Sequence, residues 1–434
     1  MNILIKSARV IDPNSSHNGK KIDILIENGK IKSIIPLNPP LKRETFRISQ
    51  RDKKLKTFTA PNLHVSPGWF DMHVNFRDPG YEYKEDLITG CRAAAFGGFT
   101  GVACMPATNP PIHTKSEVEY VKNKTEGSIV DVHPIGALSY QMQGKDLTEM
   151  FDMHNSGAVA FSDDKIPVSN SGLLLRALLY VNGFNGLIIS HSEDNIISFD
   201  GMMNEGPTST SLGLHGIPSL AEEIIVSRNI YLAEYTNSRI HLSTISTAKS
   251  VDLIRAAKTK GIKVTAEVAA HHLALDDSVL SGFDSNYKVN PPLRGKPDIK
   301  ALKKGLADGT IDAICSDHSP EDEEMKKREF DNAAFGMIGM ETAYALANTN
   351  LTGTLSLIQL VHKLAIRPRE ILNLSVPAIK EGEKANLTLF APSKEWTFTE
   401  EDIRSKSKNT PFIGTKFKGK ALGIYNNKQF VISD

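Results

Sequence analysis

DMHVNFRDPG, residues 71–80, follows an apolar run and places His73 and Asn75 two positions apart. Side chains at positions i and i+2 of a strand point to the same face, so this strand end presents an imidazole and an amide side by side. A zinc-dependent hydrolase would be expected to place two histidines there. The stretch therefore predicts a metal-binding strand end in which one ligand has been changed.

Apolar, β-rich runs alternate with helical patterns such as residues 171–183 and 248–261 through the middle of the chain. Repeated strand-then-helix units indicate a parallel sheet with helices on its faces. Eight candidate strands follow one another: residues 65–75, 100–106, 129–136, 157–164, 186–194, 238–246, 261–272 and 312–320. This number favours a closed α/β barrel over an open sheet.

Both ends of the chain carry a different pattern, of short strands joined by tight turns. ENGK, residues 27–30, is a hairpin signal near the N-terminus, and YNNK, residues 425–428, is a similar one near the C-terminus. We therefore expect a barrel over residues 64–375, and a small β-sandwich that residues 1–63 and 376–434 form together.

Length and composition limit the classes of function. The 434 residues suit a large barrel with a smaller attachment, and a formal net charge of +1 gives no field that would draw nucleic acid or an anionic membrane. The three cysteines, Cys91, Cys104 and Cys315, have neither disulfide-framework nor metal-knuckle spacing. With no apolar run long enough to span a membrane, we expect a cytoplasmic protein whose partners are small molecules or proteins.

Polar residues follow the apolar runs at the ends of several candidate strands. They are His73, Asp163, Asp164, His191, His241, Asp317 and His318. In a barrel these strand ends meet at one mouth, where neutral imidazoles, a carboxylate and an open position make a zinc site. Taken singly, each is more often a hydrogen-bonded polar residue without metal. The adjacent pair His271 and His272 cannot both point into the mouth, so we expect a structural or supporting role for them.

Nine motifs together resemble the dihydroorotases of the amidohydrolase superfamily along nearly the whole chain. They are SPGWFDMHVNFRDPGYEYKEDLITG, GGFTGVACMPATNPP, AFSDD, SHSED, HLSTISTA, EVAAHHL, VNPPLR, SDHSPED and NTPFIGTKFKGK. The resemblance implies a TIM-like (β/α)8 metallo-hydrolase barrel with a β-sandwich built from both termini. It also implies reversible hydrolysis of dihydroorotate to N-carbamoyl-aspartate in pyrimidine biosynthesis.

The resemblance implies one or two zinc ions and a role for each site residue. The implied metal positions are His73, Asn75, Asp164 (or Asp163), His191, His241 and Asp317. Asp317 would also be the catalytic base that moves the proton while the metal activates water. The implied substrate positions are Arg77, Ala107, Asn290, Glu321 and the backbone around Phe335 and Gly336.

Three of these positions depart from the family pattern. Asn75 stands where the family has a histidine ligand, and a neutral amide oxygen is a poor donor to zinc. Ala107 replaces an asparagine that would hydrogen-bond the substrate carboxylate, a contact worth about 1.5–3 kcal/mol. Glu321 replaces a histidine, and an ionised side chain there would repel that carboxylate. We therefore expect the first metal site to be weakened and dihydroorotase activity to be impaired or lost.

Several readings stay open from the sequence. The retained Asp164, His191, His241 and Asp317 could hold one metal, or these polar groups could hydrogen-bond one another without metal. A cyclic-amide hydrolase could act on another substrate, with Glu321 receiving a cationic or hydrogen-bond-donating group. Alternatively, the chain is a non-catalytic scaffold that partners aspartate transcarbamoylase, as inactive dihydroorotase-like chains of this family do. The resemblance also suggests a homodimer.

Overall fold

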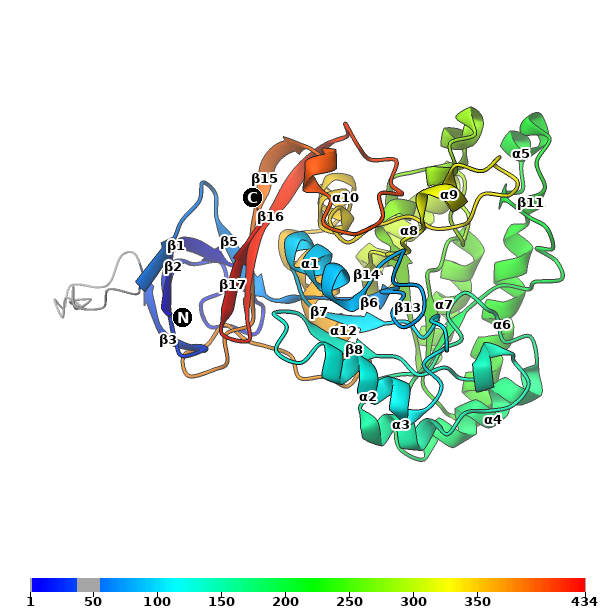
Figure 1. Cartoon of the computed structure of the whole chain (residues 1–434), viewed down its shortest axis with the longest axis horizontal. Helices are drawn as coiled ribbons and strands as arrows, with labels where there is room; N and C mark the ends of the chain where they lie inside the picture. The colour runs from blue at the N-terminus through cyan, green and yellow to red at the C-terminus, as the bar shows by residue number, and fades with distance from the viewer. Residues whose placement is uncertain (1, 37–54, 434) are drawn as a thin grey trace.

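The computed structural model describes residues 2–36 and 55–433. Figure 1 shows two parts side by side: a sheet that combines the two ends of the chain, and a larger α/β body formed by the middle of the chain. The two ends of the chain lie in the same part, as their similar strand patterns predict.

The α/β body contains two groups of parallel strands. The first group is β6 (Trp69–Val74), β7 (Phe99–Cys104) and β8 (Asp131–Pro134), and the second is β9 (Ile188–His191), β12 (Ile240–Ser243), β13 (Val264–Ala269) and β14 (Ala313–Cys315). Parallel bridges join the groups on both sides, from Val74 to His318 on one and through Phe161 to Gly136 and Ile188 on the other. The strands and bridges together make a ring.

Seven of the eight candidate barrel strands appear as strands, whereas residues 157–164 do not. In this segment only Phe161 makes ladder bridges, one to each neighbour. The backbone N–H of Phe161 donates to Leu187 O at 2.9 Å, and Phe161 O accepts from Ile189 N at 2.9 Å. The segment thus fills the fourth position of the ring with too few paired residues to be a regular strand.

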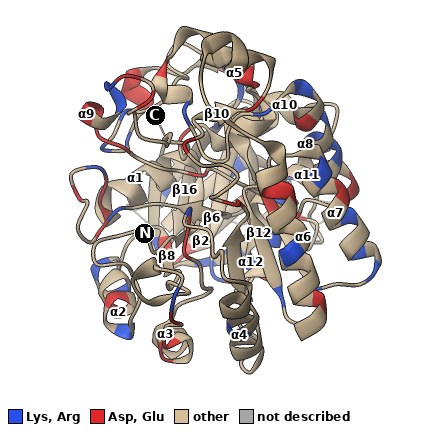
Figure 2. Ribbon diagram, turned by 90° about the vertical axis from the view of Figure 1, so that its right-hand side faces the viewer, with Lys and Arg blue, Asp and Glu red and all other residues tan. Residues whose placement is uncertain are grey.

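Helices surround these strands in the end-on view of Figure 2. The longer ones are α1 (Leu87–Gly97), α2 (Lys115–Lys124), α3 (Met150–Ser156), α4 (Ser171–Asn182), α6 (Ser219–Thr236), α7 (Ala248–Thr259), α8 (Lys296–Asp308) and α10 (Ala343–Leu351). The shorter elements are β10 (Met203–Asn204), β11 (Gly216–Ile217), α5 (Pro207–Leu212), α9 (Glu323–Lys326), α11 (Leu357–Val361) and α12 (Arg367–Ile371). The helical patterns at residues 171–183 and 248–261 are confirmed as α4 and α7. Asn170 and Thr247 cap them by accepting backbone N–H groups of the first turn.

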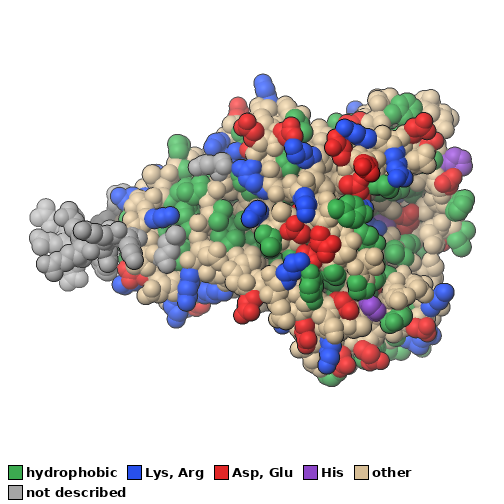
Figure 3. Space-filling model, viewed as in Figure 1, with side chains coloured by type: hydrophobic (Ala, Val, Ile, Leu, Met, Phe, Trp, Pro, Cys, Tyr) green, Lys and Arg blue, Asp and Glu red, His purple; other side chains and the backbone are tan. Residues whose placement is uncertain are grey.

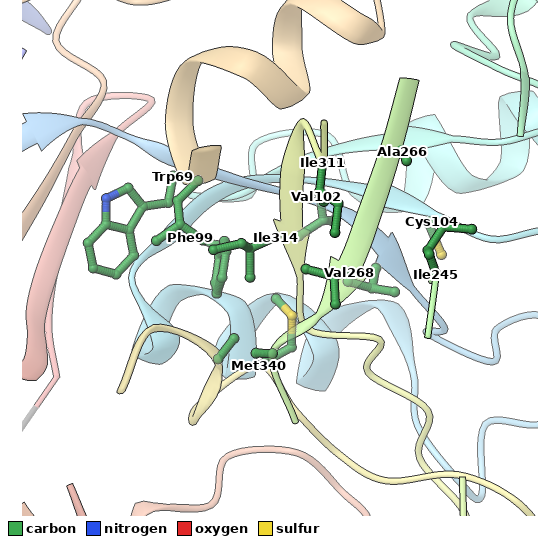
Figure 4. Packing of buried hydrophobic residues seen from close by; sticks show 14 of the residues in the cluster. Trp69, Phe99, Val102, Cys104, Ile245, Ala266, Val268, Ile311, Ile314 and Met340 are labelled. Atoms are coloured by element: carbon green, nitrogen blue, oxygen red, sulfur yellow. The ribbon is translucent and has the colours of Figure 1, made fainter. Parts of the chain in front are cut away.

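Apart from the partly exposed β8, the barrel strands are largely buried on both faces, which explains their continuous apolar runs. Trp69, Val102, Val268 and Ile314 belong to the large core between strands and helices, part of which Figure 4 shows. Their sequence neighbours on the same strands, such as Phe70 and Ala313, pack in a second cluster. On β7, β9 and β14, consecutive residues belong to different clusters, so successive side chains point to opposite sides of the strand.

The terminal sheet has the strand order β17-β16-β15-β5-β1-β2-β3, with β4 paired to β1. Its strands are β1 (Asn2–Val10), β2 (Lys21–Glu27), β3 (Lys30–Pro36), β4 (Leu55–Phe58), β5 (His64–Pro67), β15 (Leu387–Thr397), β16 (Lys416–Asn426) and β17 (Gln429–Ile432). Both predicted hairpins are confirmed, with positive φ at Asn28 and Gly29 in one and at Asn427 and Lys428 in the other. The sheet includes β5, while the division of the chain at residues 63 and 375 remains a prediction.

None of the helices in the described part of the chain combines the length and apolar character that crossing a membrane requires. On the face shown in Figure 3, basic and acidic side chains are interspersed, as the net charge of +1 suggests.

Candidate active site at the barrel mouth

The predicted site residues sit at the ends of five barrel segments. His73 lies on β6, His191 ends β9, His241 lies on β12, Asp164 follows the Phe161 bridge, and Asp317 follows β14. All five are at most 4% exposed. Asp164 and Asp317 have positive φ angles of 50° and 51°, a conformation that aspartate tolerates better than most residues. The positive φ angles mark a local change of backbone direction at both positions.

His73 is the centre of a polar network. Its Nε2 lies 3.1 Å from Asp164 Oδ1 and 3.5 Å from Asp317 Oδ1, and its Nδ1 lies 2.7 Å from Ser243 Oγ and 3.3 Å from Glu267 Oε1. Burial and the charge of nearby Lys165 favour the neutral ring, yet the surrounding carboxylates outweigh them and raise the pKa of His73 to about 9. Both ring nitrogens therefore face carboxylates, an arrangement suited to an imidazolium.

Asn75 binds the same carboxylate as His73. Its Nδ2 donates to Asp164 Oδ2 at 3.1 Å, while its Oδ1 finds no hydrogen-bond partner among the residues that the structure describes. Asp164 thus accepts from His73 on one oxygen and from Asn75 on the other. Burial raises the pKa of Asp164, but the His73 hydrogen bond and charge leave it below its usual value.

Lys165 brings a positive charge into this network. Its Nζ lies 2.8 Å from Asp317 Oδ1 and 3.3 Å from Thr244 Oγ1, and its side chain is 24% exposed. Burial lowers the pKa of Lys165, yet the charges of Asp317 and Asp164 leave it above the ordinary value. Asp317, the implied catalytic base, is therefore paired with an ammonium group.

His241 and His191 contribute from the neighbouring strands. His241 Nδ1 lies 2.9 Å from Thr265 Oγ1 and its Nε2 lies 3.7 Å from Glu267 Oε2, so Glu267 links it to His73. His191 Nε2 lies 3.2 Å from Glu193 Oε2. Burial raises the pKa of Glu193, but hydrogen bonds and charge from His191 lower it to about 2. His191 thus pairs with a carboxylate outside the His73 network.

Asp163 points away from this site. Its Oδ1 accepts the backbone N–H of Ser139 at 2.9 Å, and its Oδ2 accepts the Ser139 hydroxyl. Burial raises the pKa of Asp163 to about 6 despite these hydrogen bonds. The Asp163 side chain is thus committed to Ser139, while Asp164 faces His73, which favours Asp164 over Asp163 for the bridging position that the resemblance implies.

The implied anion-binding residue, Arg77, faces a carboxylate of the chain itself. Its Nη2 donates to Glu321 Oε1 at 3.0 Å and to Ser319 Oγ at 2.9 Å. Lys84 Nζ lies 2.5 Å from the other oxygen of Glu321, and Asn409 Oδ1 accepts the Glu321 backbone N–H at 3.1 Å. Glu321 is only 6% exposed. It thus shares its charge between two cations at the mouth.

The remaining implied substrate positions border this arrangement. Gly336 has a φ of 133°, and a side chain there would meet Ser319 O at 2.8 Å, so the loop carrying Glu321 packs directly against it. The Phe335 ring lies under Lys288 Nζ, 4.9 Å from the ring centroid. Asn290 Oδ1 is buried and has no hydrogen-bond partner in residues 2–36 and 55–433, and Ala107 is partly buried and adds no polar group.

The residues of the mouth do not fit a metal ion in this arrangement. Within the described ranges, no three His, Cys, Asp or Glu side chains are grouped so that they could hold one. The oxygens of Asp164 face N–H groups of His73 and Asn75, and Asp317 Oδ1 faces the Lys165 ammonium. Zinc ligands must instead offer lone pairs to the ion.

Sequence reasoning missed Lys165, Lys84 and Glu267. Lys165 directly follows the Asp-Asp pair of FSDDK, so the sequence could have predicted a lysine close to these carboxylates. Glu267 interrupts the apolar run of β13, and a buried carboxylate in a strand requires a partner. The sequence around Lys84 could not predict its ion pair, because its partner Glu321 lies far along the chain.

Comparisons with known proteins agree with this architecture. The Dihydro-orotase-like family model matches residues 63–250. The dihydroorotase of Geotalea daltonii is 45% identical over 97% of this chain and 97% of its own length. That of Pelotomaculum thermopropionicum is 44% identical over 96% of both.

Solved structures show the same fold. The L-hydantoinase (dihydropyrimidinase) from Arthrobacter aurescens superposes with a TM-score of 0.82 at 22% identity, covering 99% of this chain and 96% of that one. A D-hydantoinase superposes with a TM-score of 0.83 at 23% identity, covering 100% and 96%. These likenesses show a TIM-like α/β barrel fold, and the full-length matches at 44–45% identity carry the family assignment. The chain belongs to the dihydroorotase family.

Proposed function

We propose that this chain serves pyrimidine biosynthesis as a dihydroorotase-family protein whose own turnover of dihydroorotate is impaired or lost. The observation that carries the proposal is the Glu321–Arg77 ion pair at 3.0 Å. By resemblance, Arg77 would hold the substrate carboxylate, but here a carboxylate of the chain already takes that place. A substrate would have to displace Glu321 and then bind beside its negative charge.

The catalytic base position supports the same proposal. A base must accept a proton from the reacting group, and Asp317 is held 2.8 Å from the Lys165 ammonium. The ammonium group occupies the side of Asp317 Oδ1 from which a substrate proton would have to arrive. The chain would therefore have to move Lys165 before Asp317 could act.

A cyclic-amide hydrolase acting on a different, cationic substrate is less well supported. Such a substrate would need the charge of Glu321, yet Arg77 and Lys84 both pair with that carboxylate. We favour a non-catalytic role, in which the folded barrel is a homodimeric cytoplasmic scaffold that partners aspartate transcarbamoylase. The lost contacts at the mouth would not disturb an outer surface that binds a protein.

The test is ring opening of dihydroorotate and ring closure of N-carbamoyl-aspartate by the full chain, purified from a host without its own dihydroorotase. Zinc-supplemented and chelator-treated protein would be compared with Asp317→Ala. We expect the three preparations to be indistinguishable. Zinc-dependent turnover that disappears in Asp317→Ala would refute the proposal.

The scaffold role has its own test. The chain would be mixed with aspartate transcarbamoylase from the same organism and examined by size-exclusion chromatography with light scattering. We expect co-elution at a defined stoichiometry. Separate elution of the two proteins at micromolar concentration would remove the scaffold role while leaving the question of turnover to the assay above.

A further inference from the structure

The buried carboxylates at the barrel mouth need a cation. Asp164, Asp317 and Glu267 are at most 4% exposed, and carboxylates removed from water are costly unless they are paired and hydrogen-bonded. His73 contacts all three carboxylates, but a single imidazolium can balance only one of their three negative charges. In a metal-bearing hydrolase, the metal ions would compensate such a set of charges.

Lys165 reaches this position because of the backbone that precedes it. Asp164 adopts a φ of 50°, and the chain turns there as it leaves the ring. The next side chain, Lys165, reaches into the mouth, with Nζ 2.8 Å from Asp317 Oδ1 and 3.3 Å from Thr244 Oγ1. Surface lysines of this chain are far more exposed: Lys327, for example, is 74% exposed against 24% for Lys165.

The donors around Lys165 use the oxygens that a metal ion would need. Asp164 Oδ1 faces His73 Nε2, Asp164 Oδ2 accepts from Asn75 Nδ2, and Asp317 Oδ1 faces Lys165 Nζ. Asn75 strengthens the effect, because it presents its N–H side and not its oxygen to Asp164. A divalent cation brought to the same oxygens would also be repelled by the ammonium group.

We propose that the Lys165 ammonium replaces a metal cation at the barrel mouth, so that the protein folds and keeps this site closed without bound metal. The proposal goes beyond the loss of turnover and can fail separately from it. A metal-free protein that opens dihydroorotate would refute only the proposed function. An inactive protein that holds zinc would refute only the role of Lys165.

The first measurement uses the unaltered full chain. Metal content would be determined by inductively coupled plasma mass spectrometry after expression with added zinc chloride and desalting, and thermal unfolding would be followed with chelator and with zinc. We expect far less than one zinc per chain and the same Tm in both conditions. Near-stoichiometric zinc, or a Tm that falls with chelator, would overturn the proposal.

The second measurement isolates the lysine. Asn75→His supplies an imidazole at the strand end, and zinc binding to this variant would be compared with binding to Asn75→His combined with Lys165→Met. We expect the double variant to bind zinc at least about tenfold more tightly, because the competing charge is gone. Equal affinity in the two variants would overturn the proposal. Asn75→His combined with Lys327→Met, at an exposed lysine, is the matched control.

The third measurement checks the chemical state of Lys165. An intact mass under native conditions, followed by peptide mapping, would show whether one carbon dioxide is bound to its Nζ. We expect the unmodified mass. A carbamate at Lys165 would overturn the proposal, since it would convert the cation into an anion that could itself bind metal.

Discussion

Arg77 and Glu321 are 244 positions apart in the chain and meet at the barrel mouth, with Nη2 3.0 Å from Oε1. Arg77 has a positive φ of 60°. Its Nε also donates to Pro320 O at 3.3 Å, so Arg77 binds both the backbone next to Glu321 and the Glu321 side chain. The pair couples the loop after β6 to the loop after β14. A ligand anion can use Arg77 only by breaking this coupling.

Removing the charge of Glu321 should therefore open the anion position. For Glu321→Gln we expect N-carbamoyl-aspartate to bind about tenfold or more tightly than to the unaltered chain, because Arg77 and Lys84 become available to it. Isothermal titration calorimetry at low ionic strength would measure this. Glu323→Gln, at a position that is 76% exposed, is the control and should leave binding unchanged. Unchanged binding in Glu321→Gln would show that Arg77 does not receive the ligand.

The buried Asp163 should be important for stability and not for metal or substrate binding. Asp163→Ala leaves the buried N–H and hydroxyl of Ser139 without their acceptor, so we expect a loss of about 1–3 kcal/mol in the free energy of unfolding. Urea denaturation would measure the loss, with the exposed Asp152→Ala as control. A free energy of unfolding equal to that of the unaltered chain would contradict the assignment.

Acid should destabilise the fold through His272. Burial lowers its pKa from 6.5 to about 4, so the unfolded chain takes up this proton before the folded one does. The stability linked to the neutral ring is complete above pH 6.5 and is lost as the pH falls toward 4, by up to about 3 kcal/mol. We expect the stability difference between the unaltered chain and His272→Gln to change by that amount between these pH values and to stay constant above pH 7. Parallel stability curves from pH 7 to 4 would contradict this.

Arg369 on α12 should stabilise the packing of this helix against the start of β6 and against β7. Its guanidinium, only 4% exposed, donates to the carbonyls of Gly68 and Ala365 and to Thr100 Oγ1. Arg369→Met would remove these three buried hydrogen bonds, so we expect a loss of about 2–4 kcal/mol in the free energy of unfolding. Arg328→Met, at an exposed position, should change it little. A loss no larger than that of the control would show that water replaces the guanidinium.

Local sequence chemistry predicted the elements well. ENGK and YNNK predicted their hairpins because Asn and Gly accept the positive φ that such turns need. The segment at residues 157–164 was harder, because its apolar run suggested a strand, yet only Phe161 pairs with its neighbours. The number of paired residues depends on strands elsewhere in the ring, which no local window contains.

The departures at Asn75, Ala107 and Glu321 were visible in the sequence, but their partners were not. Glu321 was expected to act on a substrate by like-charge repulsion, whereas in the fold its charge is shared between Arg77 and Lys84. Such pairings are set by which loops the barrel brings together. The hydrogen bond from Asn75 to Asp164 is of the same kind, since it joins the end of β6 to the segment that carries the Phe161 bridges.

The sheet built from both ends of the chain also sets the order of events during synthesis. β5 pairs with β15, and the backbone N–H of Trp69 donates to Thr388 Oγ1 across 319 positions. β5 is synthesised long before β15, so the edge of β5 that pairs with β15 stays open until the barrel has been synthesised. A chain that stalls before β15 would display an unpaired β5 edge with apolar Val65 beside it. Pairing of β5 with β15 is therefore possible only after the whole barrel has been synthesised, so the terminal sheet closes late in the synthesis of the chain.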